Sequence, residues 1–87
     1  MFVSRYQKII DRIINSSGTI TYVELTYILK KLGYNEIKTG KTSGSRVAFY
    51  NQKRNLLIRL HKPHPGNELK DYQIKLIRIH FEENKLL

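Results

Sequence analysis

The first part of the chain has apolar and polar residues at the spacing of an amphipathic helix. Between Phe2 and Asn15, apolar side chains recur every three or four residues, with charged side chains between them. The run Asn15 to Gly18 ends this pattern, so we predict a first helix over residues 2–15. Its apolar positions are Phe2, Tyr6, Ile9, Ile10, Ile13 and Ile14.

A second helix is predicted by signals at both of its ends. Thr21 and Glu24 have the spacing of a capping box, in which each side chain accepts a hydrogen bond from the backbone N–H of the other residue. Gly33 stands where a left-handed residue would close the helix, and Tyr34 is placed to pack back on it. The residues expected to be buried are Leu25, Ile28, Leu29 and Leu32.

After Gly33 the chain contains short segments rich in β-branched and aromatic residues, which are typical of strands. We predict strands at Tyr34–Lys38, Arg46–Tyr50 and Leu56–His61, the last two joined as an antiparallel hairpin by residues 51–55. Alternate residues of the third strand would face the core and the opposite surface. The expected core residues are Leu56, Ile58 and Leu60. The expected outward residues are Leu57, Arg59 and His61.

Two prolines separate the third strand from a last helix. Pro63 and Pro65 have no N–H to donate to a sheet, so the strand should stop near His61. We predict that Asn67 is the N-cap of the last helix. The apolar residues that follow this cap are Leu69, Tyr72, Leu76, Ile77 and Phe81.

The elements follow the order α-α-β-β-β-α, which predicts an α+β fold with helices packed on a three-stranded antiparallel sheet. The second and third helices would cover one face of the sheet and leave the other face for binding. With 87 residues and no long linker, we expect a single domain over residues 1–87. The chain has no cysteine, no apolar run of membrane-spanning length and no secretory signal, so we expect a soluble cytoplasmic protein without disulfides.

The charge is strongly positive and concentrated in the middle of the chain. There are 16 Lys and Arg against 7 Asp and Glu, a formal net charge of +9. No acidic residue lies between Glu36 and Glu68. Such a surface suits a phosphate backbone or an acidic protein partner, although a merely solvated basic face is the alternative. The cations in this interval are Lys38, Lys41, Arg46, Lys53, Arg54, Arg59 and Lys62.

The loop Gly40 to Arg46, with the sequence GKTSGSR, combines glycines, small hydroxyl residues and cations. Such a loop can turn sharply and offer backbone N–H groups to a phosphate, although an ordinary polar turn is the alternative. The order of residues in a P-loop is absent. The candidate RNA or phosphate contacts in and beyond this loop are Lys41, Ser45, Arg46, Arg59 and Lys62.

Two histidines in the basic segment, His61 and His64, are candidates for proton transfer. RNA cleavage without a metal uses the 2′-hydroxyl of the substrate as nucleophile, so the protein needs a base, an acid and a cation. We expect no metal site and no cofactor, because there is no cysteine, no helical HxxxH pair and no carboxylate close by. Alternatively, His64 only shapes the corner between the prolines. His80 lies within the last helix and is expected to be structural or superficial.

These motifs together resemble the HicA family of toxin–antitoxin mRNA interferases. The similar parts are the LGY end of the second helix, GxxSGSR, the FxN of the second strand and LHKPHPGNELKxYQ before the last helix. The resemblance covers about residues 21–81 and leaves residues 1–16 as an additional N-terminal helix. It implies a fold like that of double-stranded-RNA-binding domains, cleavage of mRNA, and neutralisation by a HicB-like antitoxin.

The sequence departs from the family pattern at the residue that the resemblance makes catalytic. The family has a GSH motif at the start of the second strand, and this chain has Gly44, Ser45 and Arg46 there. A guanidinium does not release a proton near neutral pH, although it can bind phosphate. Three interpretations therefore remain: His61 or His64 transfers the proton, the protein binds RNA without cutting it, or it is a diverged partner-binding module.

Overall fold

The computed structural model describes residues 3–37 and 46–87. The elements are α1 (Arg5–Asn15), α2 (Tyr22–Lys31), β1 (Asn35–Ile37), β2 (Arg46–Asn51), β3 (Leu56–His61) and α3 (Asp71–Glu83). The strands form one antiparallel sheet in the order β1-β2-β3. The predicted α+β fold and the order of its elements are confirmed.

Helix α1 begins later than predicted. It starts at Arg5 because the hydroxyl of Ser4 accepts a hydrogen bond from the backbone N–H of Gln7 at 3.1 Å and so caps the helix. On the predicted apolar face, Ile9, Ile10 and Ile13 are buried and Tyr6 is half-buried, but Ile14 is 43% exposed. Phe2 lies outside the described residues. Helix α1 packs against both α2 and α3.

Both ends of α2 agree with the prediction. At the start, the Glu24 N–H donates to Thr21 Oγ1 at 3.1 Å, and the Thr21 N–H donates to Glu24 Oε1 at 3.0 Å. At the end, Gly33 has a φ of 97° and the N–H of Tyr34 donates to the carbonyl of Leu29 at 2.8 Å, which is a Schellman motif. This motif buries Tyr34, so β1 begins at Asn35 instead of Tyr34. Lys38 lies outside the described residues. The other expected core residues are buried (Leu25, Ile28 and Leu29) or half-buried (Leu32).

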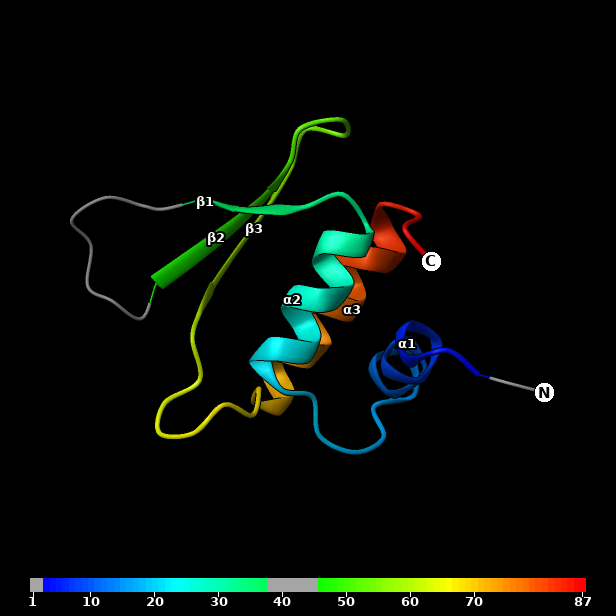
Figure 1. Ribbon diagram of the computed structural model, residues 1–87, viewed down its shortest axis with the longest axis vertical. Helices are drawn as coiled ribbons and strands as arrows, with labels where there is room; N and C mark the ends of the chain where they lie inside the picture. Colours follow the sequence, from blue (N-terminus) through cyan, green and yellow to red (C-terminus); the bar gives the residue numbers. More distant parts are fainter. Residues whose placement is uncertain (1–2, 38–45) are drawn as a thin grey trace.

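The sheet has one face toward the helices and one face toward solvent (Figure 1). The inner face carries Phe49 of β2 opposite Ile58 of β3, and both belong to the core that the helices complete. In β3, Leu56 and Leu60 are half-buried on this face, whereas the three residues predicted to face outward are exposed (Leu57, Arg59 and His61). Helices α2 and α3 lie between the sheet and α1.

The side chain of Asn51 joins the hairpin to the end of α2 through hydrogen bonds. Its side chain is buried, and its Nδ2 donates to the carbonyl of Leu32 at 3.0 Å. Its Oδ1 accepts from the backbone N–H of Arg54 in the turn at 3.0 Å. Strand β2 therefore ends at Asn51, one position beyond the predicted end at Tyr50.

The prediction that Asn67 caps the last helix is wrong. The carbonyl of Asn67 accepts from the Tyr22 N–H at 2.7 Å, and the Leu69 N–H donates to the carbonyl of Ile20 at 2.8 Å. The segment 67–69 is therefore extended alongside the start of α2, and α3 begins only at Asp71, with Lys70 as N-cap.

Helix α3 also buries a different face from the one its apolar residues indicated. Ile77 and Phe81 are buried as expected, together with Ile74, but Tyr72 is 59% and Leu76 60% exposed. Leu69 is buried, although it precedes the helix. An apolar stripe of α3 is thus left at the surface.

Candidate nucleic-acid interface

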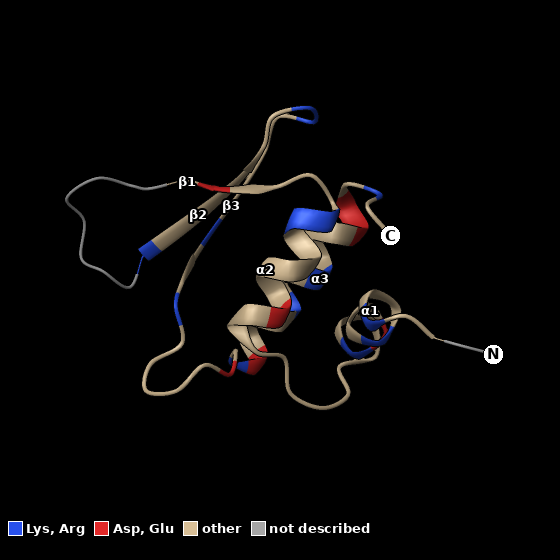
Figure 2. Ribbon diagram, in the orientation of Figure 1, with Lys and Arg blue, Asp and Glu red and all other residues tan. Residues whose placement is uncertain are grey.

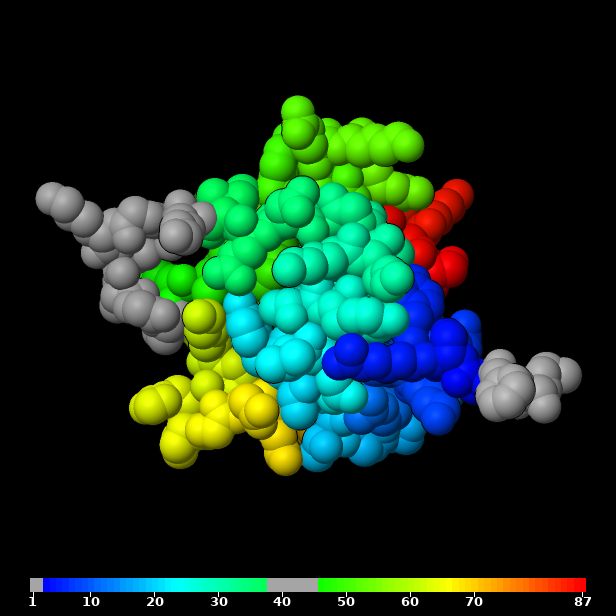
Figure 3. Space-filling model, viewed as in Figure 1, coloured from blue at the N-terminus to red at the C-terminus, as the bar shows by residue number. Residues whose placement is uncertain are grey.

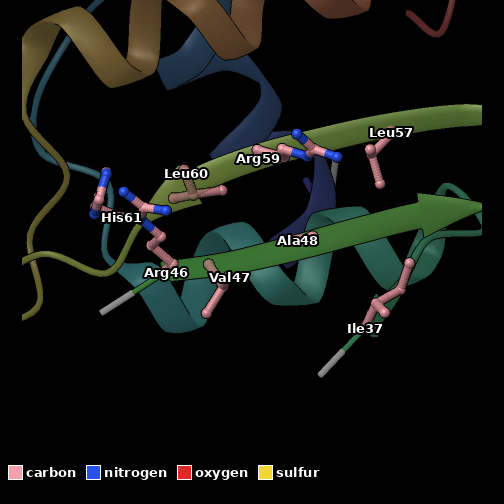
Figure 4. A pocket seen from close by; sticks show the side chains of 8 residues that line it. All are labelled: Ile37, Arg46, Val47, Ala48, Leu57, Arg59, Leu60 and His61. Carbon is pink, nitrogen blue, oxygen red and sulfur yellow. The ribbon is translucent and has the colours of Figure 1, made fainter. Parts of the chain in front are cut away.

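The outer face of the sheet brings together cations and a histidine from β2 and β3. Arg46 pairs directly with His61, and Ala48 pairs with Arg59. Side chains of directly opposed residues lie on the same face with their Cβ atoms about 5 Å apart. Figure 4 shows the side chain of Arg46 beside that of His61, with Arg59 further along β3. This places a potential proton carrier next to a permanent cation.

A hollow of about 510 Å³ lies over this part of the sheet. It forms because Ala48, in the middle of the outer face, is small and is flanked across the strands by the larger side chains of Ile37 and Arg59. Its lining combines apolar side chains with cations, as an interface for bases and phosphates requires. The lining residues are Ile37, Arg46, Val47, Ala48, Leu57, Arg59, Leu60 and His61.

The charge around this face has one sign. Figure 2 shows Lys and Arg at the start of β2, on β3 and in the segment after it, with no acidic residue among them. Glu36, on β1, pairs with Phe49 and so belongs to the other face of the sheet. The outer face therefore attracts anions.

Gln73 holds the end of β3 that carries His61. Its Nε2 donates to the backbone carbonyl of His61 at 2.9 Å, and its Oε1 accepts from the backbone N–H of Lys70 at 2.9 Å. The side chain is buried, so both hydrogen bonds are shielded from water. Sequence reasoning missed Gln73, although a glutamine three residues after a helix N-cap is a known capping signal.

Lys62 does not join the cations of the outer face. Its Nζ lies 5.6 Å from the centre of the Tyr22 ring. The hydroxyl of Tyr22 donates to Glu36 at 3.4 Å, and burial, together with this carboxylate, raises the pKa of Tyr22 to about 12. Lys62 therefore sits beside a neutral tyrosine.

The remaining predicted site residues lie in loops. His64 is exposed in the loop after β3, which Figure 3 shows standing out from the body of the molecule (residues 62–68, yellow). His61 lines the hollow on the sheet, whereas His64 is not among its described lining residues. Lys41 and Ser45 lie outside the described residues.

The third histidine has a structural position. The Nε2 of His80 lies 2.6 Å from the hydroxyl of the buried Tyr34, and burial lowers the pKa of His80. This pair links α3 to the end of α2, away from the outer face of the sheet.

Residues 3–37 and 46–87 contain no group of three or more His, Cys, Asp or Glu side chains that could hold a metal ion. None of the helices described in the structure is long and apolar enough to cross a membrane.

Comparisons with known proteins agree with the fold and with the motifs. No curated protein and no solved structure matches the chain. The family model described as the HicA toxin of bacterial toxin–antitoxin systems matches residues 23–82, which include nearly all of α2, the whole sheet and nearly all of α3. The chain therefore belongs to the HicA toxin family.

Proposed function

We propose that this toxin is an RNA-binding protein of the bacterial cytoplasm that cleaves mRNA without a metal or other cofactor and is neutralised by a HicB-like antitoxin. The observation that carries the proposal is the direct pairing of Arg46 with His61 on the exposed, cationic face of the sheet. We take residues 21–81 as the RNA-binding core of one domain, with the N-terminal helix as an addition that enlarges the apolar core.

The pairing supplies two of the groups that RNA cleavage needs. When the 2′-hydroxyl attacks the adjacent phosphorus, a base must take its proton and a cation must stabilise the charge that develops on the phosphoryl oxygens. His61 is the candidate base or acid, and Arg46 and Arg59 stabilise the charge. His64 is the candidate for the second proton transfer.

This arrangement makes up for the missing histidine of the family's GSH motif. Arg46 occupies that position, and its direct partner across the sheet is His61. In this proposal His61 supplies the imidazole from the neighbouring strand, on the same face of the sheet as Arg46. Lys41 and Ser45 then contribute contacts to phosphates flanking the cleaved bond, whereas Lys62, beside Tyr22, lies outside the site.

Cleavage is tested by incubating the purified protein with single-stranded RNA in EDTA and analysing the ends of the products. We expect products with a 2′,3′-cyclic phosphate, and a rate that falls roughly 10²- to 10⁴-fold in His61→Ala, as for the loss of a general acid or base. His64→Ala should cause a similar loss, whereas Arg46→Ala should slow cleavage without changing the products. Full activity of His61→Ala would contradict the proposed site.

The alternative is a module that binds RNA or the antitoxin without catalysis, which the replacement of the GSH histidine by Arg46 favours. RNA affinity measured against salt tests whether the outer face binds RNA, and the cleavage assay decides whether it also cuts. Arg46→Ala and Arg59→Ala should each reduce the slope of log K against log salt by about 0.7, whereas Lys8→Ala, on α1, should not. Binding with this pattern but no cleavage would leave the non-catalytic alternative.

A further inference from the structure

A groove of about 300 Å³ runs between β3 and α3, next to the hollow on the outer face, with which it shares its β3 wall. Its walls are unusually apolar for a surface, because Leu57 of β3 is 42% exposed and Tyr72 and Leu76 of α3 are 59% and 60% exposed. Tyr72 and Leu76 are one helical turn apart and so form a continuous stripe. A cluster of exposed large apolar side chains along a groove marks a binding surface.

The strand on the other side of the groove has an open edge. Strand β3 is last in the order β1-β2-β3, and within residues 3–37 and 46–87 it pairs with β2 alone. The carbonyl of His61 bonds to Gln73 of α3, so the backbone groups of His61 face the groove. Because this direction alternates along an antiparallel strand, the backbone N–H and C=O groups of Arg59 and Leu57 face the groove too. These groups can pair with one further strand.

Charge indicates what kind of strand fits. Arg59 lies in the middle of β3, and Lys75 lies on α3 between Tyr72 and Leu76. Two copies of β3 paired antiparallel around Arg59 would bring these guanidinium groups together, on chains that each carry a net charge of +9. The edge therefore disfavours a second copy of this chain and favours an acidic partner.

We propose that this groove binds an extended segment of a partner protein in which acidic and apolar residues alternate. The segment adds to the sheet beside β3, its apolar side chains pack on Tyr72 and Leu76, and its carboxylates face Arg59 and Lys75. The inference uses the open edge of β3 and the surface of α3, and it holds whether or not the outer face binds RNA.

The test uses the full chain and a synthetic peptide of alternating valine and glutamate, as long as β3. We expect millimolar peptide to shift the NMR signals of the Leu57 and Arg59 amides and to slow their exchange with solvent. Tyr72→Asp and Leu76→Asp should each weaken binding by about tenfold or more, because each removes an apolar contact and adds a repelling charge. Both residues are largely exposed, so these variants should fold.

Matched controls define the site. Val23→Asp alters a side chain of α2 that is 58% exposed and should leave peptide binding unchanged. The same should hold for Lys8→Ala, which removes a cation of α1 instead of one near the groove. A peptide of valine and lysine, or one methylated on alternate backbone nitrogens that face β3, should bind much more weakly. Unprotected Leu57 and Arg59 amides, or a free chain that is dimeric until Leu76→Asp is introduced, would overturn the proposal.

Discussion

The amide of Gln73 shows how one side chain fixes the geometry of the candidate site. It accepts a hydrogen bond from the backbone N–H of Lys70, the N-cap of α3, and donates one to the carbonyl of the strand residue whose imidazole lies beside Arg46. The two bonds use the two ends of the amide, which only glutamine or asparagine can supply. Asn51 has the corresponding role at the other end of the hairpin, where it joins the turn to the end of α2.

Replacing Gln73 by Glu should remove the hydrogen bond to the carbonyl of His61 and keep the one from the backbone N–H of Lys70. The carboxylate can still accept from Lys70, and it gains from the positive end of the helix dipole, but it places an oxygen against the carbonyl of His61. We expect the free energy of unfolding to fall by about 1–3 kcal/mol, as measured by urea denaturation.

Exchange of the His61 amide should quicken in the same variant. Lys75→Ala, on the exposed side of α3, is the control and should change stability by less than about 0.5 kcal/mol. Equal stability of the Gln73→Glu and Lys75→Ala proteins would show that the bond to His61 contributes nothing.

At the scale of elements, the turn after α2 depends on a glycine for two reasons. Gly33 has a φ of 97°, and an added Cβ would lie 3.3 Å from Nδ2 of Asn51. Gly66 also has a positive φ, 88°, but an added Cβ there would meet nothing within 4 Å. Comparing a substitution at Gly33 with one at Gly66 therefore distinguishes the cost of backbone strain from the cost of steric crowding.

We predict that Gly33→Ala lowers the free energy of unfolding by roughly 1–3 kcal/mol, which is the cost of placing a non-glycine residue in the left-handed region. Because the added methyl group also crowds Asn51, we expect a loss in the upper part of this range. Gly66→Ala should cost less, because it adds no crowding and lies in an exposed loop. Thermal unfolding of both variants measures the difference. A larger loss in Gly66→Ala would mean that the loop after β3 matters more than the junction of α2 with the hairpin.

The elements that sequence predicted best are those defined by local signals. The capping box at Thr21, the closing Gly33 and the hairpin depend on residues close together in the chain. Asn67 was misassigned because its carbonyl pairs with Tyr22, far away in sequence, which no local pattern reveals. The exposure of Leu76 was missed for a similar reason, since a helix with apolar residues on more than one side does not indicate which side meets the sheet.

At the scale of the whole molecule, polar contacts that respond to pH join α2 and the turn that follows it to the other two helices. Arg12 of α1 forms a salt bridge with Glu24 of α2. Burial opposes the ionisation of Glu24, but hydrogen bonds from Arg12 and Thr21 outweigh it and lower the pKa of Glu24 below its ordinary 4.5. Burial also lowers the pKa of His80 below its ordinary 6.5, against a smaller opposing effect of Glu83.

Stability should therefore fall in two stages as pH decreases. Below pH 6.5 the unfolded chain binds a proton at His80 more readily than the folded chain does, which favours unfolding. The contribution of Glu24 is present above pH 4.5 and is lost as pH falls through its lowered pKa. Urea denaturation across this pH range should show the first stage abolished in His80→Gln and the second in Glu24→Gln. A first stage that persists in His80→Gln would assign it to another group.

The candidate site could be predicted in part. The outward position of Arg59 and His61 followed from the alternation of residues along a strand. The direct pairing of Arg46 with His61 depends on the register of the hairpin, which the length of its connection restricts but does not determine. Lys62 was grouped with the other cations because sequence does not show that the residue after His61 turns toward Tyr22.

The hydrogen bond between Gln73 and His61 also has a consequence for protein synthesis. A ribosome makes the chain from its N-terminus, so β2 and β3 emerge before α3. Until Gln73 follows, the end of β3 lacks the side chain that holds it, and segment 67–69 has yet to pair with Ile20 and Tyr22. The end of β3 that carries His61 is therefore held in place only after the last part of the chain, from residue 67 onward, has left the ribosome and docked.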